Sequence, residues 1–297
     1  METGSQEIVA VCAELGRILR PDGVLWINLA DGYSRSPREG APKKSLLLGP
    51  ERVAMQLTAS GWLLRNKVTW AKRNPMPSSV RDRLTTTHEF IYCFTRSKSY
   101  YYDLDAIREP ARTPLHSGRR GSPTYPPRSA VPSLGGGTSS RVDLNQGLRA
   151  MKARGQESHP LGKNPGDVWS IATASYRGAH FATFPIELIR RPLLATCPAR
   201  VCTACGSPWL RAASPSRRRP AEPAGSFPAC ACRAGWQPGL VFDPFLGSGT
   251  VAVAAEAYRR DWIGIELNPN YAKLAGERIA VTRQRRAANT NGPATTS

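Results

Sequence analysis

Apolar residues follow a regular pattern at the start of the chain. Over residues 6–19 the apolar side chains, from Ile8 to Leu19, recur at helical spacing, and the sequence Pro-Asp-Gly at 21–23 ends the helix. The apolar run at 23–33 then predicts a buried strand. The chain therefore opens with a helix that leads into a strand.

This order of elements recurs further along the chain. The predicted elements are a helix over residues 51–60, a strand that begins at 63 and ends near Trp70, a proline-punctuated basic loop over 73–83 and a strand over 88–97. A folded pattern also returns at 167–173 and 180–197. The repeated order of helix and strand predicts an α/β fold with a parallel sheet and helices on its faces.

The regular pattern is interrupted between residues 110 and 165. This stretch is rich in Gly, Pro, Ser and Arg, and such a composition buries too little apolar surface to order itself. Two interpretations stay open. The stretch is either a disordered linker or a basic loop that becomes ordered on a nucleic-acid backbone.

A glycine turn near the end of the chain carries the clearest chemical signal. After a strand over 239–245, Gly247 and Gly249 allow the backbone to approach a ligand closely, and a helix follows over 250–260. The next strand ends on Glu266, which follows Asp243 by 23 residues. An acid at this position can accept both hydroxyls of a ribose, so the spacing predicts a cofactor that contains adenosine.

A dehydrogenase would use a similar strand, loop and helix, but two observations exclude it. The loop lacks the third glycine of the dinucleotide fingerprint, and only 31 residues follow Glu266. A dinucleotide needs a second mononucleotide-binding half, for which this remainder is too short.

The chain is strongly basic, with a net charge of +19. Such a charge attracts polyanions, and nucleic acid is the leading partner class, while a solvated cationic face or basic tails are the alternative. The sequence shows no apolar run of the roughly 18 residues that a membrane span requires and no signal peptide, so we expect a cytoplasmic protein without a membrane anchor.

Five of the seven cysteines lie between residues 197 and 232. Two close pairs of thiols suit a tetrahedral zinc ion with a structural role, since no coordination position stays open. Isolated thiols are the alternative, and Cys197 is a substitute ligand. The predicted zinc ligands are Cys202, Cys205, Cys230 and Cys232.

The motif DPFLGSGT at 243–250, joined to GIELNPNY at 264–271, resembles the β-class of S-adenosylmethionine-dependent DNA amino-methyltransferases. These enzymes make N6-methyladenine or N4-methylcytosine. The resemblance implies a circularly permuted, Rossmann-like α/β sheet in which the catalytic half precedes the cofactor half. It also implies double-stranded DNA as the partner and S-adenosylmethionine as the cofactor.

The resemblance assigns site residues by position. Trp70, Lys72 and Asn74 are candidates to face DNA, with core packing or a solvated loop as the alternative. The cofactor loop and ribose acid correspond to Asp243, Pro244, Phe245, Gly247, Ser248, Gly249, Thr250 and Glu266. The segment that closes over the methionine end of the cofactor corresponds to His180, Thr183, Phe184 and Pro185.

The resemblance also divides the chain into segments. We expect a candidate target-recognition region at 110–165 and a small zinc-ribbon-like insert at 197–238. The remaining segments are the catalytic half at 1–109, a return to the core at 166–196, the cofactor half at 239–282 and a disordered tail at 283–297.

The catalytic turn of this family is Asp, Asn or Ser, then two prolines and an aromatic residue, which together hold a flipped base. The chain contains no such tetrapeptide, and the related sequences at 74–77 and 124–128 do not fit it. We therefore assign no catalytic residue. We expect an N-terminal truncation of roughly 30 to 60 residues that removes a central strand of the sheet.

A misplaced start codon, a decayed gene or a partner polypeptide that supplies the strand would each explain this absence. Three functions stay open: a DNA amino-methyltransferase, a non-catalytic DNA-binding remnant, and a methyltransferase acting on RNA or a small molecule. The sequence does not distinguish adenine from cytosine as the target base.

Overall fold

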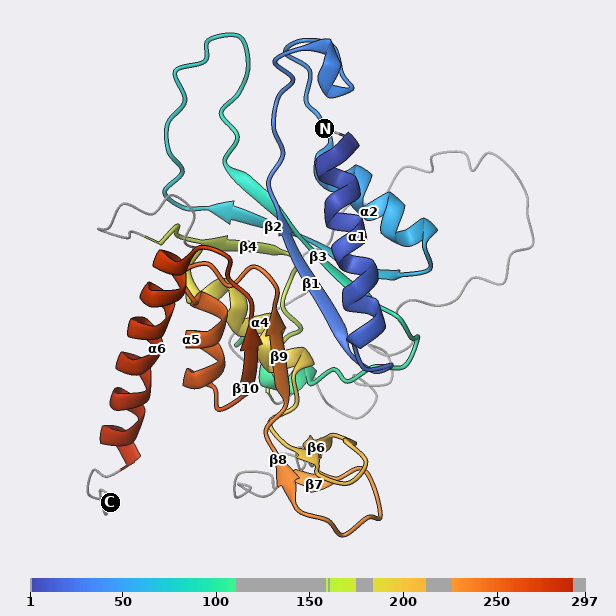
Figure 1. Ribbon diagram of the computed structural model, residues 1–297, viewed down its shortest axis with the longest axis vertical. Coiled ribbons are helices and arrows are strands. Elements are labelled where there is room, and N and C mark those ends of the chain that lie inside the picture. Colours follow the sequence, from blue (N-terminus) through green and yellow to red (C-terminus); the bar gives the residue numbers. More distant parts are fainter. Residues whose placement is uncertain (1, 111–158, 160, 175–183, 212–225, 291–297) are drawn as a thin grey trace, which may run out of the picture. The chain divides into compact units, whose positions relative to one another are not determined.

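The computed structural model describes residues 2–110, 159, 161–174, 184–211 and 226–290 (Figure 1). The chain divides into two units, of which the smaller comprises residues 108–165 and 214–221. In the described part of this smaller unit, Glu109 and Lys163 exchange two backbone hydrogen bonds, at 3.0 and 2.8 Å, and form an ion pair. None of the helices in the described ranges is long and apolar enough to cross a membrane.

In the larger unit, helices α1 (Glu2–Ile18) and α2 (Gly49–Ala59) lie side by side next to strand β1 (Val24–Leu29) (Figure 1). Pro50 lies in the first turn of α2, where the N–H that proline lacks would have no helical partner. The apolar faces of both helices meet the sheet. The buried side chains of this first core are Cys12, Val53, Ala54, Leu57, Trp62, Tyr92 and Phe94.

Strand β1 belongs to a four-stranded sheet with β2 (Leu63–Lys72), β3 (His88–Thr95) and β4 (Val168–Ile171), in the order β1-β3-β2-β4. Strand β3 is antiparallel to β1 and β2, and only β2 and β4 run parallel. The prediction of a parallel sheet is therefore wrong for β3. The connection from β2 to β3, residues 73–87, contains no helix, whereas a parallel crossover usually contains one.

Helix α4 (Ile186–Thr196) covers the other side of this sheet. The indole Nε1 of Trp26 on β1 donates to Thr196 Oγ1 at 3.1 Å, which ties the end of α4 to the sheet. The buried side chains of this second core are Val68, Trp70, Ile91, Trp169 and Leu188.

The C-terminal part contains a second, two-stranded parallel sheet of β9 (Leu240–Asp243) and β10 (Asp261–Gly264). Helix α5 (Thr250–Ala257) connects these strands and packs against α6 (Pro269–Thr290) (Figure 1). Among the described residues, β9 pairs only with β10, and β1 only with β3. Within the described residues these strands therefore form two separate sheets.

Helix α6 continues to Thr290, so residues 283–290, which we expected to belong to a disordered tail, are helical. Their anchor is the buried Glu256, whose carboxylate accepts from Trp262 Nε1 at 3.1 Å and from Arg283 Nε at 2.7 Å. Arg286 forms an ion pair with the same carboxylate. A buried carboxylate requires such partners, because its removal from water is costly.

Residues 197–238, here called the cysteine module, lie between α4 and β9 in sequence. The module contains two antiparallel strand pairs, β5 with β8 and β6 with β7. Each strand is very short. Their bounds are Val201–Cys202 for β5, Trp209–Arg211 for β6, Ser226–Pro228 for β7 and Trp236–Gln237 for β8.

Candidate functional site

The turn between β9 and α5 is closed by hydrogen bonds within a few residues. The N–H of Phe245 donates to Asp243 Oδ1 at 3.0 Å, and the N–H of Gly249 donates to the carbonyl of Leu246 at 2.8 Å. Gly247 and Gly249 have φ values of +53° and +80°. These left-handed conformations favour glycine, as the motif predicted.

Gly249 is required for a second reason, which is packing. A Cβ atom at this position would lie 2.8 Å from the Cβ of Ala275 on α6. Gly249 is also the residue that precedes the first turn of α5. The glycine therefore lets α6 pack closely against the base of the turn.

Glu266 contacts the glycine turn directly. Its Oε2 accepts from the N–H of Gly247 at 2.7 Å, and its Oε1 accepts from the N–H of Asn268 at 2.8 Å. The parallel register that pairs Gly264 with Asp243 brings the two motifs together. Each carboxylate oxygen has a second lone pair, so Glu266 can still accept from the hydroxyls of a ribose.

Exposed apolar side chains lie next to Glu266 in the sequence and in the turn. Phe245 is 69% exposed and Leu267 is 93% exposed, while Ile265 is about half exposed. Large apolar side chains exposed beside a single hydrogen-bonding carboxylate are typical of a ligand site. This surface suits a flat, apolar ring such as a purine.

Asp243, the residue that ends β9, has a raised carboxyl pKa. Burial is the main cause, the hydrogen bond from the Phe245 N–H opposes the shift, and the negative charge of Glu266 adds to it. The two carboxyl groups therefore differ in environment, although they follow neighbouring strands.

Arg278 on α6 also holds the turn, and sequence reasoning missed it. Its Nη1 donates to the carbonyl and the hydroxyl of Ser248, at 2.5 and 2.6 Å, and to Thr250 Oγ1 at 3.3 Å. Arg278 lies one helical turn after Ala275, the residue packed against Gly249. No spacing rule connects an arginine so far along the chain with a glycine motif.

The segment assigned to the methionine end of the cofactor is described in part. Phe184 and Pro185 directly precede α4, and His180 and Thr183 lie outside the described residues. Phe184, Pro185 and Arg278 line one cavity of about 500 Å³. This cavity connects the start of α4 with the arginine that holds the glycine turn.

The three candidates for DNA contact on β2 and the loop after it have structural partners. Trp70 is 4% exposed and its Nε1 donates to the carbonyl of Ile171 at 3.0 Å, so it belongs to the core and cannot face DNA. Lys72 forms an ion pair with Glu89. The exposed Asn74 accepts from the N–H of Thr173 at 2.7 Å, which orients the segment after β4.

Two loops present a basic surface that is more extensive than the three candidate residues for DNA contact. The loop over 32–48 follows β1 and the loop over 73–87 follows β2, and together they carry seven basic residues against two acidic ones. Since β1 and β2 are both antiparallel to β3, they run in the same direction, and the loops that follow them leave the sheet at the same end (Figure 1).

Side chains join these two loops. Lys44 Nζ lies 2.7 Å from Asp82 Oδ2, and this hydrogen-bonded pair raises the pKa of Lys44 and lowers that of Asp82. The guanidinium of Arg83 stacks over the ring of Tyr33, with its central carbon 3.6 Å from the ring centroid. The loops therefore form one surface, which we call the paired basic loops.

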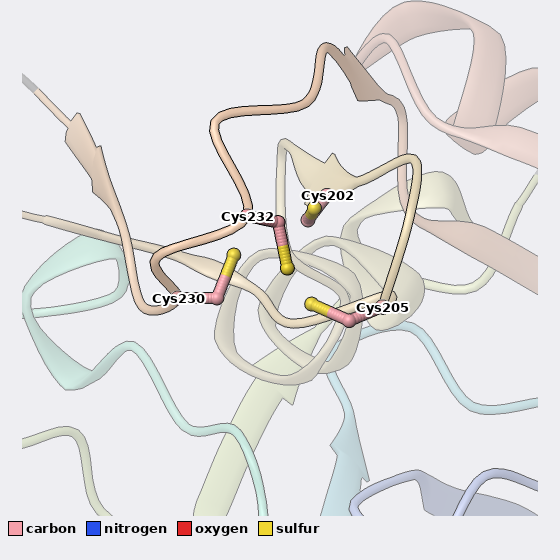
Figure 2. Close-up of side chains that lie close together, drawn as sticks. All are labelled: Cys202, Cys205, Cys230 and Cys232. Atoms are coloured by element: carbon pink, nitrogen blue, oxygen red, sulfur yellow. The ribbon is translucent and has the colours of Figure 1, made fainter.

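The four predicted metal ligands converge in the cysteine module (Figure 2). The sulfur atoms of Cys202, Cys205, Cys230 and Cys232 all lie within 4.8 Å of one another. Cys197 is not in this cluster. Its thiol is buried near the carbonyl of Pro198, and burial raises its pKa to about 11.

Comparison with known proteins adds to this geometry. The family model N6_N4_Mtase, described as DNA methylase, matches residues 4–277. The Type II methyltransferase M.XycI of Xanthomonas campestris pv. cyanopsidis is 32% identical over 293 residues, covering 92% of this chain and 70% of that protein. The Type II methyltransferase M.SmaI of Serratia marcescens is 30% identical over 295 residues, covering 92% of this chain and 73% of that methyltransferase.

A solved structure has a similar fold. It is a putative DNA modification methylase from Thermus thermophilus in complex with S-adenosyl-L-methionine, with 19% sequence identity and a TM-score of 0.50. The match covers 95% of this chain and 78% of that protein. At this identity the similarity concerns the mixed α/β fold.

Proposed function

Because the chain belongs to the N6_N4_Mtase family of DNA methylases, we propose that it is a site-specific DNA amino-methyltransferase. The methyl group comes from S-adenosylmethionine, and the acceptor is the exocyclic amino nitrogen of adenine (N6) or of cytosine (N4) in double-stranded DNA. The observation that carries this proposal is the contact of Glu266 with the glycine turn at Gly247.

That contact supports a role for each part of the site. Glu266 accepts from the ribose hydroxyls, and the exposed Phe245 and Leu267 flank the adenine ring. The turn from Asp243 to Thr250 faces the remainder of the cofactor. The cavity at Phe184 and Pro185 suits the methionine end, together with His180 and Thr183 outside the described residues.

We further propose that the fold is circularly permuted, with the segment boundaries that the sequence predicted for the two halves and the cysteine-rich insert. The order of elements supports this, because the strand and glycine turn that open a nucleotide-binding fold come here after the four-stranded sheet. In this arrangement residues 1–165 bind the target base and its DNA, and the segment at 180–185 together with the residues after the cysteine module binds the cofactor.

Methyl transfer depends on the correct positioning of the two reactants more than on chemical activation of the methyl group. Bound S-adenosylmethionine supplies a methyl group that its sulfonium already activates. The protein has to hold the amino nitrogen in line with the bond between sulfur and methyl carbon. Glu266 and the glycine turn hold the methyl donor in place. We assign no residue of this chain to hold the acceptor amino group.

The paired basic loops are the proposed DNA-binding surface of the described residues. They lie at the end of the sheet where β1 and β2 terminate, and their positive charge attracts phosphate groups. Residues 110–165 form the proposed second contact region, as the composition of this mostly undescribed segment suggests. The arginines Arg283 and Arg286 on α6 contribute less, because Glu256 already binds them.

A specific observation favours a second candidate function. The chain has no tetrapeptide of the catalytic type, which favours a protein that binds cofactor and DNA without transferring the methyl group. The two functions differ in one measurable step. Transfer of a labelled methyl group to DNA supports the enzyme, and binding of both ligands without transfer supports the second candidate.

The test uses the full chain, tritium-labelled S-adenosylmethionine and DNA of varied sequence, and labelled nucleosides are identified after digestion. We expect N6-methyladenine or N4-methylcytosine. In titration calorimetry, Glu266→Ala should weaken the binding of S-adenosylhomocysteine about 10- to 100-fold, because hydrogen bonds to a charged group contribute roughly 1.5–3 kcal/mol. The exposed Glu277→Ala is the matched control. Equal affinities of the two variants would contradict the ribose role.

A further inference from the structure

The cysteine module has little apolar interior to hold it together. Its four described strands are two or three residues long, and an isolated pair of strands is marginally stable even when longer. Two of its large apolar side chains, Phe227 and Trp236, are 49% and 47% exposed. A segment of this kind requires a cross-link or a metal ion to remain folded.

The two cysteine turns have the backbone shape for a shared ligand. After Cys205, Gly206 has a φ of +70° and its N–H donates to the carbonyl of Cys202 at 2.8 Å. After Cys232, Arg233 has a φ of +51°, which is unusual for a side chain other than glycine. Each turn therefore bends back on itself directly after its second cysteine.

The sulfur positions fit a metal ion. In a tetrahedral zinc site each Zn–S bond is about 2.3 Å, which places the sulfur atoms roughly 3.8 Å apart. The four sulfur atoms of the cluster lie within 4.8 Å of one another, so a contraction of about 1 Å or less completes the tetrahedron. Figure 2 shows the four side chains pointing toward a common centre.

We propose that Cys202, Cys205, Cys230 and Cys232 bind one Zn²⁺ ion as four thiolates. Four Zn–S bonds form, and the protons of the four thiols pass to solvent. The complex carries two net negative charges, and Arg20, which is also paired with Asp22, lies close by. A Cβ atom on Gly206 would lie 2.1 Å from Arg20 Nη1, so this guanidinium contacts the first cysteine turn.

The metal also has a mechanical role, because, besides the contact at Arg20, the described residues of the module meet the rest of the larger unit at two further places. A Cβ atom on Gly239 would lie 2.3 Å from the carbonyl oxygen of Pro198, so the chain enters and leaves the module at one point. At the other place, Arg211 Nη2 and Nε donate to Asp103 Oδ2, at 3.0 and 3.1 Å. Asp103 in turn donates its N–H to the carbonyl of Ala195 on α4.

The zinc ion therefore makes the module a rigid connection between distant segments, which we call the brace. It holds the segment after β3, residues 97–107, next to the end of α4 and the start of β9. The glycine turn and Glu266 lie at the opposite end of β9 and depend on their own hydrogen bonds. Loss of the metal should thus loosen residues 97–107 and leave the turn at 243–250 unchanged.

The experiment begins with the full chain purified without chelator. Elemental analysis should give one zinc per chain, and X-ray absorption should give four sulfur ligands at about 2.3 Å. Cys202→Ser and Cys232→Ser should lose the zinc, and Cys197→Ala, a cysteine outside the cluster, should keep it. Absence of zinc from the wild-type chain, or a mass that shows two disulfides in this segment, overturns the metal site.

Hydrogen exchange before and after zinc removal tests the brace. Exchange should increase about two- to fivefold in residues 97–107, as the loss of an ion pair of about 1 kcal/mol or less would give, and stay unchanged in residues 243–250. Equal changes in both segments, or no change in 97–107, overturn the brace. Neither measurement depends on methyl transfer, so the inference stands or falls separately from the proposed function.

Discussion

The glycine turn and the cysteine module both contain tight turns, but different interactions hold each of them in shape. Both contain tight turns with left-handed residues, such as Gly249 in the first and Arg233 in the second. The glycine turn is closed by hydrogen bonds and by close packing against α6. The module relies on four converging sulfur atoms. The segment with few internal contacts therefore depends on the proposed zinc ion, whereas contacts within the chain hold the glycine turn.

The largest expected effect comes from breaking the packing of the glycine turn. Gly249→Ala places a Cβ atom 2.8 Å from Ala275 and imposes a left-handed φ on alanine. Overpacking and backbone strain together should lower the free energy of unfolding by about 3 kcal/mol. Urea denaturation measures this change. The neighbouring Gly276→Ala, where a Cβ atom meets nothing within 4 Å, should raise stability by about 0.5–1 kcal/mol.

An intermediate effect is expected from Arg278. Arg278→Gln removes the cation that donates to Ser248 and Thr250, so the turn loses its fixed shape. Binding of S-adenosylhomocysteine should weaken about tenfold, which corresponds to roughly 1.4 kcal/mol. Arg278→Lys, which keeps the charge and one donor, should recover part of the affinity. An unchanged dissociation constant for the glutamine variant would remove Arg278 from the cofactor site.

The smallest effect concerns the contact of the cysteine module with Asp103. Arg211→Ala removes an ion pair in which the arginine side chain is 47% exposed, so the loss of stability should be about 1 kcal/mol or less. Limited proteolysis should nevertheless show faster cleavage in residues 97–107. The exposed Arg285→Ala is the control and should change neither property. Faster cleavage in both variants would contradict a specific contact.

The sequence predicted those parts of the molecule whose constraints are local. The strand, glycine turn and helix at 239–260 were predicted because each residue type is required by its immediate neighbours in the chain. The approach of the four cysteines was predicted for a similar reason, since metal ligands occur in short pairs. The direct hydrogen bond from Gly247 to Glu266 was not predicted, because it depends on strand register.

The parts that sequence reasoning missed depend on contacts between distant segments. The antiparallel direction of β3 follows from the absence of a helix between residues 73 and 87, which the periodic pattern did not weigh. Trp70 was a candidate for DNA contact, and its burial depends on α4, more than a hundred residues later. Arg278 and the anchoring of α6 by Glu256 likewise arise only after the helices pack.

The link between the paired basic loops has a consequence for the thermodynamics of association. Because Lys44 binds Asp82 and Arg83 stacks on Tyr33, the two loops lose part of their conformational freedom before they meet a polyanion. Less entropy is then lost on binding, so more of the electrostatic attraction contributes to affinity. Rising ionic strength would act twice, since it screens the attraction to phosphates and also weakens the ion pair that holds the loops together.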